Sequence, residues 1–141
     1  MMGQLEKVKQ CTDLHTSSFS QLVIYEFIKQ GLIEPHIEKI KANYLEKRNT
    51  MMNSLERHFP SGVTWTNPEG GLFLWLELPK NVSAKDMLPR AIEMGVTYVY
   101  GSPFFSAGGG ENTMRLGFSN PTLPDIAEGI KRLGALLREK V

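Results

Sequence analysis

Leucine occupies every second position from residue 72 to residue 78 in the segment GGLFLWLELP. Successive side chains of a β-strand point to opposite faces of a sheet, so these leucines share one face, while Phe73, Trp75 and Glu77 share the other. The preceding segment VTWTN, residues 63–67, predicts a second strand, and residues 68–71 between them are typical of a turn. Because both faces of the longer strand carry large apolar side chains, we expect both faces to be covered.

Helices and further short strands are predicted on either side of this strand pair. Ser83 and Asp86 form an acidic variant of the capping box that begins a helix, although Pro89 should kink that helix or delay its start. Thr122 is a typical N-cap for the last helix. The order of elements predicts the α/β class, as an α+β two-layer architecture with a small mixed or antiparallel sheet covered by helices, in a single domain of residues 1–141. The predicted helices cover residues 17–30, 35–59, 83–95 and 122 onward, and the further strands cover residues 95–100 and 113–119.

The helix predicted at residues 17–30 is apolar around most of its circumference. Ser17 provides a cap at its start, and Gly31 provides a stop behind it. Such a helix is normally buried on most sides, and a small domain offers few places for it, so we expect it to contact a partner surface. Its apolar residues are Phe19, Leu22, Val23, Ile24, Tyr25, Phe27 and Ile28.

Composition and motifs argue against several classes of function. The net charge is +1 and no run of Lys and Arg is present, so we expect no nucleic-acid binding. No apolar stretch is long enough to span a membrane, and the polar N-terminal segment is no signal peptide. Cys11 is the single cysteine, which favours a reducing, cytoplasmic location. His15, His36 and His58 have no partner at a catalytic spacing, so we expect structural roles for them and no metal site.

Arg115 lies in the strand predicted from the segment TMRLGFS, residues 113–119. The apolar residues of this strand alternate with it, so the arginine points from the opposite face. Gly117 and Ser119 leave space on that face for a planar guanidinium, which can bind a carboxylate or phosphate through two parallel hydrogen bonds. The alternative is a solvated arginine that pairs with Glu77 across the sheet.

A glycine-rich loop precedes this strand. Gly108, Gly109 and Gly110 can adopt backbone conformations closed to other residues, and we expect a mobile lid there. Phe104 and Phe105 form either an apolar wall beside a cleft or core residues beneath the loop. The common phosphate-binding glycine motifs are absent, so the sequence does not support a cofactor phosphate site in this chain.

Three segments together resemble the C-terminal, small domain of fold-type I pyridoxal-phosphate enzymes. They are NPEGGLFLWLELP, GVTYVYGSPFFSAGGGENTMRLGFSN and IAEGIKRLGALL. The family that they resemble is the class I and II aminotransferases, with the 2-aminoadipate and MocR-like branch as the nearest subgroup. The resemblance extends from about Leu5 to Leu137, and the pairing of the two strand motifs at this separation makes it specific.

The resemblance implies roles for individual residues. Arg115 matches the arginine that binds the α-carboxylate of the substrate. Gly70 and Gly71 match the turn that lines the cleft, and Phe105 matches the aromatic residue of the loop that enters the site. Tyr100 departs from the family pattern, because a proline usually precedes the glycine of that loop.

The resemblance also implies partners and a cofactor. Thr16 and Ser17 lie in a segment that resembles part of the subunit interface of relatives, so they could approach the cofactor of a neighbouring subunit in a homodimer. The cofactor-binding lysine of the family belongs to a larger domain that this chain lacks, and exposed lysines stay protonated and react poorly with an aldehyde. We therefore expect no catalytic residue in this chain and no pyridoxal phosphate bound to it alone. We predict exposed lysines at Lys29, Lys39, Lys41, Lys47, Lys131 and Lys140.

The implied activity is that of the complete enzyme, which would transfer an amino group from an amino acid to a 2-oxo acid with pyridoxal 5'-phosphate. Two alternatives stay open. The chain could be a free-standing module that binds an amino acid or another carboxylate, or that only oligomerises. It could also be a piece of a MocR-like transcription regulator.

Overall fold

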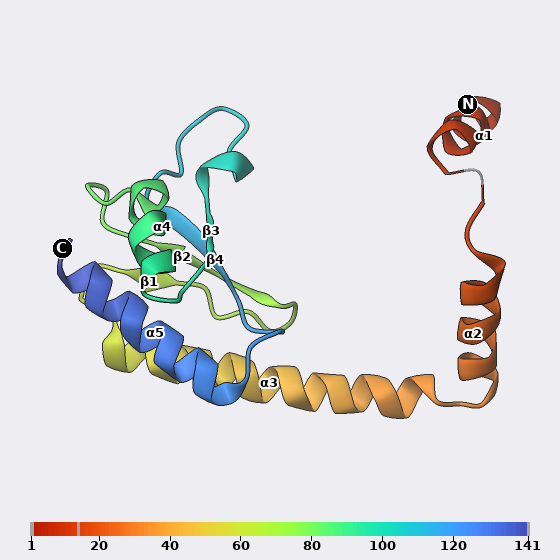
Figure 1. The fold of residues 1–141 in the computed structure, drawn as a ribbon, viewed down its shortest axis with the longest axis horizontal. Coiled ribbons are helices and arrows are strands. Elements are labelled where there is room, and N and C mark those ends of the chain that lie inside the picture. The colour runs from red at the N-terminus through yellow and green to blue at the C-terminus, as the bar shows by residue number, and fades with distance from the viewer. Residues whose placement is uncertain (1, 14, 141) are drawn as a thin grey trace. The chain divides into compact units, whose positions relative to one another are not determined.

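The computed structural model describes residues 2–13 and 15–140, which form two compact units, Met1–Lys41 and Ala42–Val141. The first unit contains α1 (Met2–Thr12), α2 (Ser18–Lys29) and the beginning of α3 (Ile33–His58), which continues into the second unit (Figure 1). Assignment of residues 1–141 to a single domain stays a prediction. No helix in the described ranges combines the length and the apolar character needed to cross a membrane.

Helix α2 begins and ends where the sequence predicts. The side chain of Ser17 accepts a hydrogen bond from the backbone N–H of Ser20, and Gly31 follows the helix with a φ of 68°, a conformation that suits glycine. Every side chain of α2 is exposed. Helix α1 was not predicted, because its polar sequence shows no clear apolar face.

The second unit is built around a four-stranded antiparallel sheet in the order β1-β2-β4-β3. The strands are β1 (Thr64–Trp65), β2 (Phe73–Glu77), β3 (Val99–Tyr100) and β4 (Thr113–Gly117), and the helices are α4 (Ala84–Glu93) and α5 (Leu123–Arg138) beside the second half of α3. The predicted α+β class is therefore confirmed, and the sheet is antiparallel rather than mixed.

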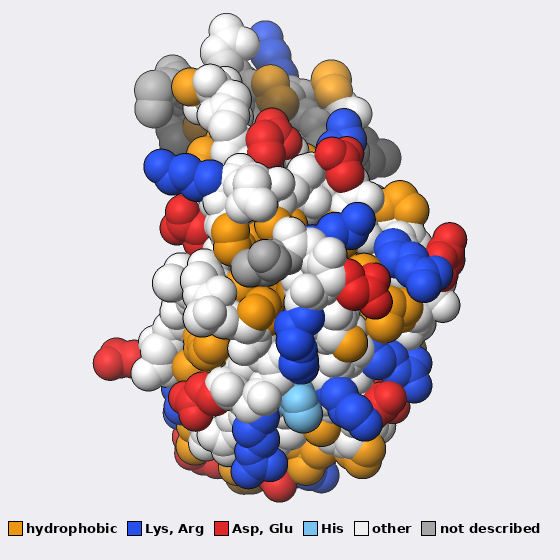
Figure 2. Space-filling model, turned by 90° about the vertical axis from the view of Figure 1, so that its left-hand side faces the viewer, with side chains coloured by type: hydrophobic (Ala, Val, Ile, Leu, Met, Phe, Trp, Pro, Cys, Tyr) orange, Lys and Arg blue, Asp and Glu red, His pale blue; other side chains and the backbone are white. Residues whose placement is uncertain are grey.

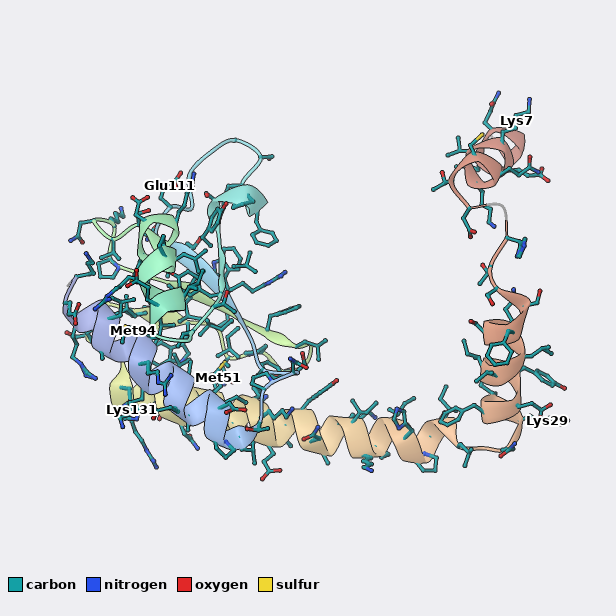
Figure 3. All side chains as sticks on the ribbon, viewed as in Figure 1. Lys7, Lys29, Met51, Met94, Glu111 and Lys131 are labelled. Atoms are coloured by element: carbon teal, nitrogen blue, oxygen red, sulfur yellow. The ribbon has the colours of Figure 1, made fainter. Side chains whose placement is uncertain are left out.

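The hydrophobic core lies on one face of this sheet. Leu74 and Leu76 of β2 and Met114 of β4 are fully buried, and Met51 points from α3 toward the sheet (Figure 3). On the other face Phe73 and Glu77 are exposed. The expectation that both faces are covered is wrong for the described residues, because α3, α4 and α5 supply apolar side chains to the leucine face alone. The core residues from the helices include Leu55, Met87, Ala91, Ile126, Ile130, Leu133, Leu136 and Leu137.

Helices α4 and α5 begin at the predicted caps. Ser83 accepts a hydrogen bond from the N–H of Asp86, and the helix starts directly after it, so Pro89 within the helix does not delay the start. Thr122 and Asp125 form a complete capping box at the start of α5. Hydrogen bonds from the side chain and the backbone of Thr122 lower the pKa of the Asp125 carboxyl.

Helix α5 approaches the end of α3 closely. A Cβ atom at Gly134 would collide with the carbonyl group of His58, and Arg138 donates a hydrogen bond of 2.8 Å to that carbonyl oxygen. The outer side of the unit is polar: Lys131 lies on the exposed side of α5 (Figure 3), and basic and acidic side chains are interspersed on the face in Figure 2. Mixed charges of this kind give no single-sign patch on that face.

Candidate functional site

Arg115 lies at the centre of the open face of the sheet. Its neighbours across the strands are Trp75 of β2 and Val99 of β3. The side chain is half-buried, yet among the described residues no carboxylate and no hydrogen-bond acceptor contacts it. Glu77 lies opposite Thr113 in the strand register, and no ion pair joins its carboxylate to Arg115 in the described part of the chain, so the alternative of an Arg115–Glu77 pair is wrong. A half-buried guanidinium whose donors are unused is suited to binding an external anion.

Aromatic side chains surround this guanidinium. The Cζ atom of Arg115 lies 4.1 Å from the ring centroid of Phe73 and 5.1 Å from that of Phe104, which ends the short 3₁₀ helix Ser102–Phe104. Trp75 packs edge-on against Phe104 with the ring centroids 5.5 Å apart, and Phe105 lies 6.2 Å from Trp75. Because Phe104 and Phe105 are exposed, they are not core residues beneath the loop, and the apolar wall beside a cleft stays a prediction.

Two glycines give these rings their space. Gly117 is the partner of Phe73 across β2 and β4, and it leaves room for the phenyl ring beside Arg115. Gly101 is buried, and a Cβ atom there would collide with the side chain of Thr113 and lie 3.0 Å from the Trp75 indole. A side chain at Gly101 would therefore displace its neighbours, whereas Gly117 leaves a limited space beside the Phe73 ring.

The loop that carries these aromatic residues turns through three consecutive glycines. Gly108, Gly109 and Gly110 have φ values of 80°, 95° and 72°, a region that side chains disfavour. A Cβ atom at Gly110 would also collide with the ring of Phe105, so this glycine lets the ring lie against the loop. The mobile lid stays a prediction.

A cavity of about 490 Å³ borders the arginine. Its lining includes Arg115, Phe73, Val99 and Asp125, together with the core residues Met51, Leu116, Ile126, Ile130 and Leu133. Asp125 is the only carboxylate among the described lining residues, and its Oδ2 already accepts hydrogen bonds from the backbone N–H and the hydroxyl of Thr122. The volume of this cavity falls in the range of small-molecule sites. The positive charge of Arg115 at its border favours an anionic ligand.

Helix α3 holds the turns at both ends of this site. Arg48 donates a hydrogen bond of 2.8 Å to the carbonyl oxygen of Pro68, in the turn before β2, and Lys47 donates one of 2.8 Å to Ser119, in the turn after β4. Gly70 and Gly71 complete the first turn, and Gly71 has a φ of 82° that glycine adopts readily. Both glycines are exposed next to Phe73, and their role as cleft-lining residues stays a prediction.

Thr16 and Ser17 belong to the first unit. The carbonyl of Thr16 accepts a hydrogen bond from Gln21, and the hydroxyl of Ser17 caps α2. Their approach to a cofactor of a neighbouring subunit stays a prediction.

The lysines do not provide a cofactor site. All of them are exposed except Lys47, whose amine donates to Ser119. At Lys41, the hydrogen bond and the charge of Glu38 raise the pKa of the ammonium, which opposes its use as a nucleophile. The described residues therefore do not fit pyridoxal phosphate by themselves.

Residues that could bind a metal ion are also dispersed. Within residues 2–13 and 15–140, no group of three or more His, Cys, Asp or Glu side chains could hold a metal ion. His36 packs edge-on against Phe27, and His15 contacts the carbonyl of Thr16. These contacts agree with structural roles for the two histidines.

Sequence reasoning did not place Phe73 and Phe104 at the arginine. The alternation in β2 and β4 put Phe73 and Arg115 on the faces opposite their apolar neighbours, but the strand register was needed to bring the two together. Phe104 lies in a loop, where no periodicity indicates its position.

Comparison with known proteins gives one family and a set of close relatives. The model of the family "Aminotransferase class I and II" matches residues 3–133. The 2-aminoadipate transaminase of Thermus thermophilus is 43% identical over 137 residues, which are 97% of this chain and 34% of that protein. The HTH-type transcriptional regulator YdfD of Bacillus subtilis is 31% identical over 139 residues, 99% of this chain and 28% of that protein. The chain thus spans about a third of the length of the curated relatives that it matches.

A solved structure resembles the whole chain. The α-aminoadipate aminotransferase LysN of Thermus thermophilus, crystallised with N-(5'-phosphopyridoxyl)-L-leucine, matches with a TM-score of 0.90 and 42% identity. The match covers 98% of this chain and 35% of that one. The fold and the sequence motifs therefore point to the same group of proteins.

Proposed function

Because this chain belongs to the family of class I and II aminotransferases, we propose that it is the C-terminal part of a pyridoxal-phosphate-dependent transaminase and binds the substrate carboxylate there. The observation that carries the proposal is Arg115, a half-buried guanidinium that borders a cavity and has no carboxylate partner among the described residues. The substrates would be an amino acid and a 2-oxo acid, since both carry a carboxylate next to the reacting carbon.

Arg115 would act by binding and orientation. Its planar guanidinium can donate two parallel hydrogen bonds to one carboxylate, which fixes both the position and the rotation of the substrate. Orientation of this kind lowers the barrier of the chemical step, because the reacting bond is held in the productive direction before reaction. The aromatic wall of Phe104 and Phe105 would keep water from one side of the carboxylate.

Pyridoxal phosphate supplies an electron sink that makes the α-proton of a bound amino acid removable. The described residues do not fit this cofactor, so its lysine and phosphate contacts would come from the part of the whole protein that this chain lacks. LysN supports this division, because it carries a phosphopyridoxyl adduct and is about three times as long as the segment matched here.

Association with other chains is part of the proposal. The exposed apolar side chains of α2 would pack against the larger domain or a second subunit of a homodimer in the cytoplasm. The near-neutral charge supports neither nucleic acid nor membrane as a partner of this chain.

Substitution of Arg115 in the whole enzyme tests the proposal. The enzyme can be assembled by putting this chain in place of the 137 matching residues of the Thermus thermophilus transaminase. Arg115→Lys keeps the charge but loses the two parallel hydrogen bonds, so we expect KM for the amino acid to rise about tenfold or more. Arg132→Lys changes an exposed arginine of α5 and serves as the matched control. An unchanged KM for every amino donor in Arg115→Lys would refute the proposal.

A transcription regulator is the second candidate, supported by the similarity to YdfD at lower identity. Arg115 would then bind a carboxylate effector. A whole protein that binds DNA, responds to an amino acid and does not transaminate would favour this candidate.

A further inference from the structure

Phe73 and Phe104 are large apolar residues that remain exposed in the second unit, as Val99 and Phe105 also do. The exposed fractions of the residues are 46% for Phe73 and 52% for Phe104. Burial of apolar area within this chain therefore does not explain why phenyl rings occupy these positions. What both rings share is the Arg115 guanidinium, with Cζ within 4.1 Å and 5.1 Å of the two ring centroids.

We propose that Phe73 and Phe104 are positioning residues that orient the Arg115 guanidinium and present its N–H groups to the substrate carboxylate. The proposal rests on the proposed role of Arg115. A cation over an aromatic ring is attracted by the electrons of the ring face, and arginine also stacks on it. Because hydrogen bonds of a guanidinium lie in its plane, a ring against its face leaves those donors available.

The two rings are themselves held in place. Phe73 occupies the space that Gly117 leaves across the strand pair. Phe104 packs against Trp75, the neighbour of Arg115 across the strands, and Trp75 is in turn held against Gly101. The aromatic groups are thus fixed by the sheet, so they can restrict an arginine that has no other side-chain partner among the described residues.

This arrangement would orient an arginine at position 115 but not a lysine. An ammonium group has no plane to align with a ring, and its donors point in all directions, so the same rings would not select one orientation. The aromatic contacts therefore add to the recognition of a planar carboxylate, whichever amino acid carries it.

The first test uses the 141-residue chain and nuclear magnetic resonance of the Arg115 side chain. Ring currents should shift the Nε–H and Cδ proton signals of Arg115 upfield. In Phe73→Leu these signals should move toward ordinary values, whereas Phe73→Tyr keeps a ring and should retain the shift. Signals that are ordinary in the parent chain, or unchanged in Phe73→Leu, would overturn the contact itself.

The second test uses the whole enzyme assembled with the Thermus thermophilus remainder. Each exposed cation–aromatic contact corresponds to about 2- to 5-fold in binding, so Phe73→Leu and Phe104→Leu should each raise KM by that factor and the pair by more. We expect kcat to change less and Phe73→Tyr to restore KM. In the 141-residue chain, where both rings are exposed, the melting temperature of each variant should stay near that of the parent. Ile92→Ala removes an exposed side chain from α4 and controls for loss of apolar surface.

The outcomes distinguish this inference from the proposed function. If Arg115→Lys raises KM while both leucine variants keep the parent KM, the positioning role is wrong and the carboxylate site stands. If neither Arg115→Lys nor the leucine variants change KM, the positioning role and the carboxylate site are both wrong. If Phe73→Tyr raises KM as much as Phe73→Leu, a ring is insufficient and the positioning role is also overturned.

Discussion

Phe73 lies directly across from Gly117 in the β2–β4 pair, and a Cβ atom placed on Gly117 would lie 3.4 Å from two atoms of the phenyl ring. This distance is ordinary van der Waals contact, so a single methyl group fits against the ring. A larger side chain would project further into the space that the ring occupies beside Arg115. The size of the side chain at position 117 therefore determines whether the Phe73 ring can lie beside the Arg115 guanidinium.

Gly117→Val should move the Phe73 ring away from Arg115. We expect a rise in KM of about 2- to 5-fold in the whole enzyme, as for loss of one cation–aromatic contact. Gly117→Ala, which adds the tolerated methyl group alone, is the matched control and should stay close to the parent. The measurements are KM for the amino acid in the whole enzyme and the Arg115 proton shifts in the 141-residue chain. Equal KM values for the valine and alanine variants would contradict the steric limit.

The same substitution at two glycines of α5 should have opposite effects on stability. At Gly134 an added methyl group would collide with the His58 carbonyl, so Gly134→Ala should lower the free energy of unfolding by about 1–3 kcal/mol through overpacking. A Cβ atom at Gly129 would have a Val96 methyl at 4.0 Å as its nearest neighbour, so an added methyl group fits there. Gly129→Ala should therefore raise the free energy of unfolding by about 0.5–1 kcal/mol through helix propensity.

Urea denaturation of the 141-residue chain measures both α5 variants. Each variant is the control for the other, since the residue change and the helix are identical. Stabilisation by Gly134→Ala would show that α3 and α5 are further apart than the His58 contact indicates.

Local sequence signals predicted the helices whose ends are marked by capping residues in the sequence. Ser17 and Gly31 bound α2, and Thr122 begins α5, because a cap satisfies backbone groups of its own helix. The alternation in β4 likewise placed Arg115 on the face opposite the core.

The open face of the sheet could not be predicted in the same way. Phe73 and Trp75 are as apolar as core residues, so pattern alone indicated a second covering layer that the described residues do not supply. The position of Phe104 depends on its contact with Trp75, which lies 29 residues earlier in the chain. Contacts of this range are set by strand register and loop path, for which a single sequence has no local signal.

The capping box of α5 should make stability depend on pH in the acidic range. Hydrogen bonds from Thr122 lower the pKa of Asp125 below its ordinary value of 3.8 in the folded state. A carboxyl whose pKa is lower when folded contributes stability above its unfolded pKa and loses it as the pH falls through the folded value. Asp125→Asn should therefore melt at a lower temperature than the parent near neutral pH. This difference in melting temperature should shrink below about pH 4, where the carboxylate of the parent becomes protonated.

Thr122→Val is a second variant that tests the same hydrogen bond from the other side. It removes the hydroxyl that donates to Asp125 at 2.6 Å and should flatten the acid dependence in the same way. A difference between Asp125→Asn and the parent that stays constant from neutral to strongly acidic pH would contradict the role of the ionised carboxylate.

Exposed apolar residues on α2 should make the 141-residue chain associate with itself. Phe19, Leu22 and Ile24 are 76%, 63% and 58% exposed, and burial of such side chains between two chains is favourable. Leu22→Glu combined with Ile24→Glu places charges on two sides of the helix and should shift the chain toward monomer, while Gln21→Glu adds a charge at a polar position and should not. Sedimentation velocity over a range of concentrations, with binding of an apolar dye, gives the measurement. A parent chain that stays monomeric at its highest concentration and binds no dye would show that this helix is not an association surface.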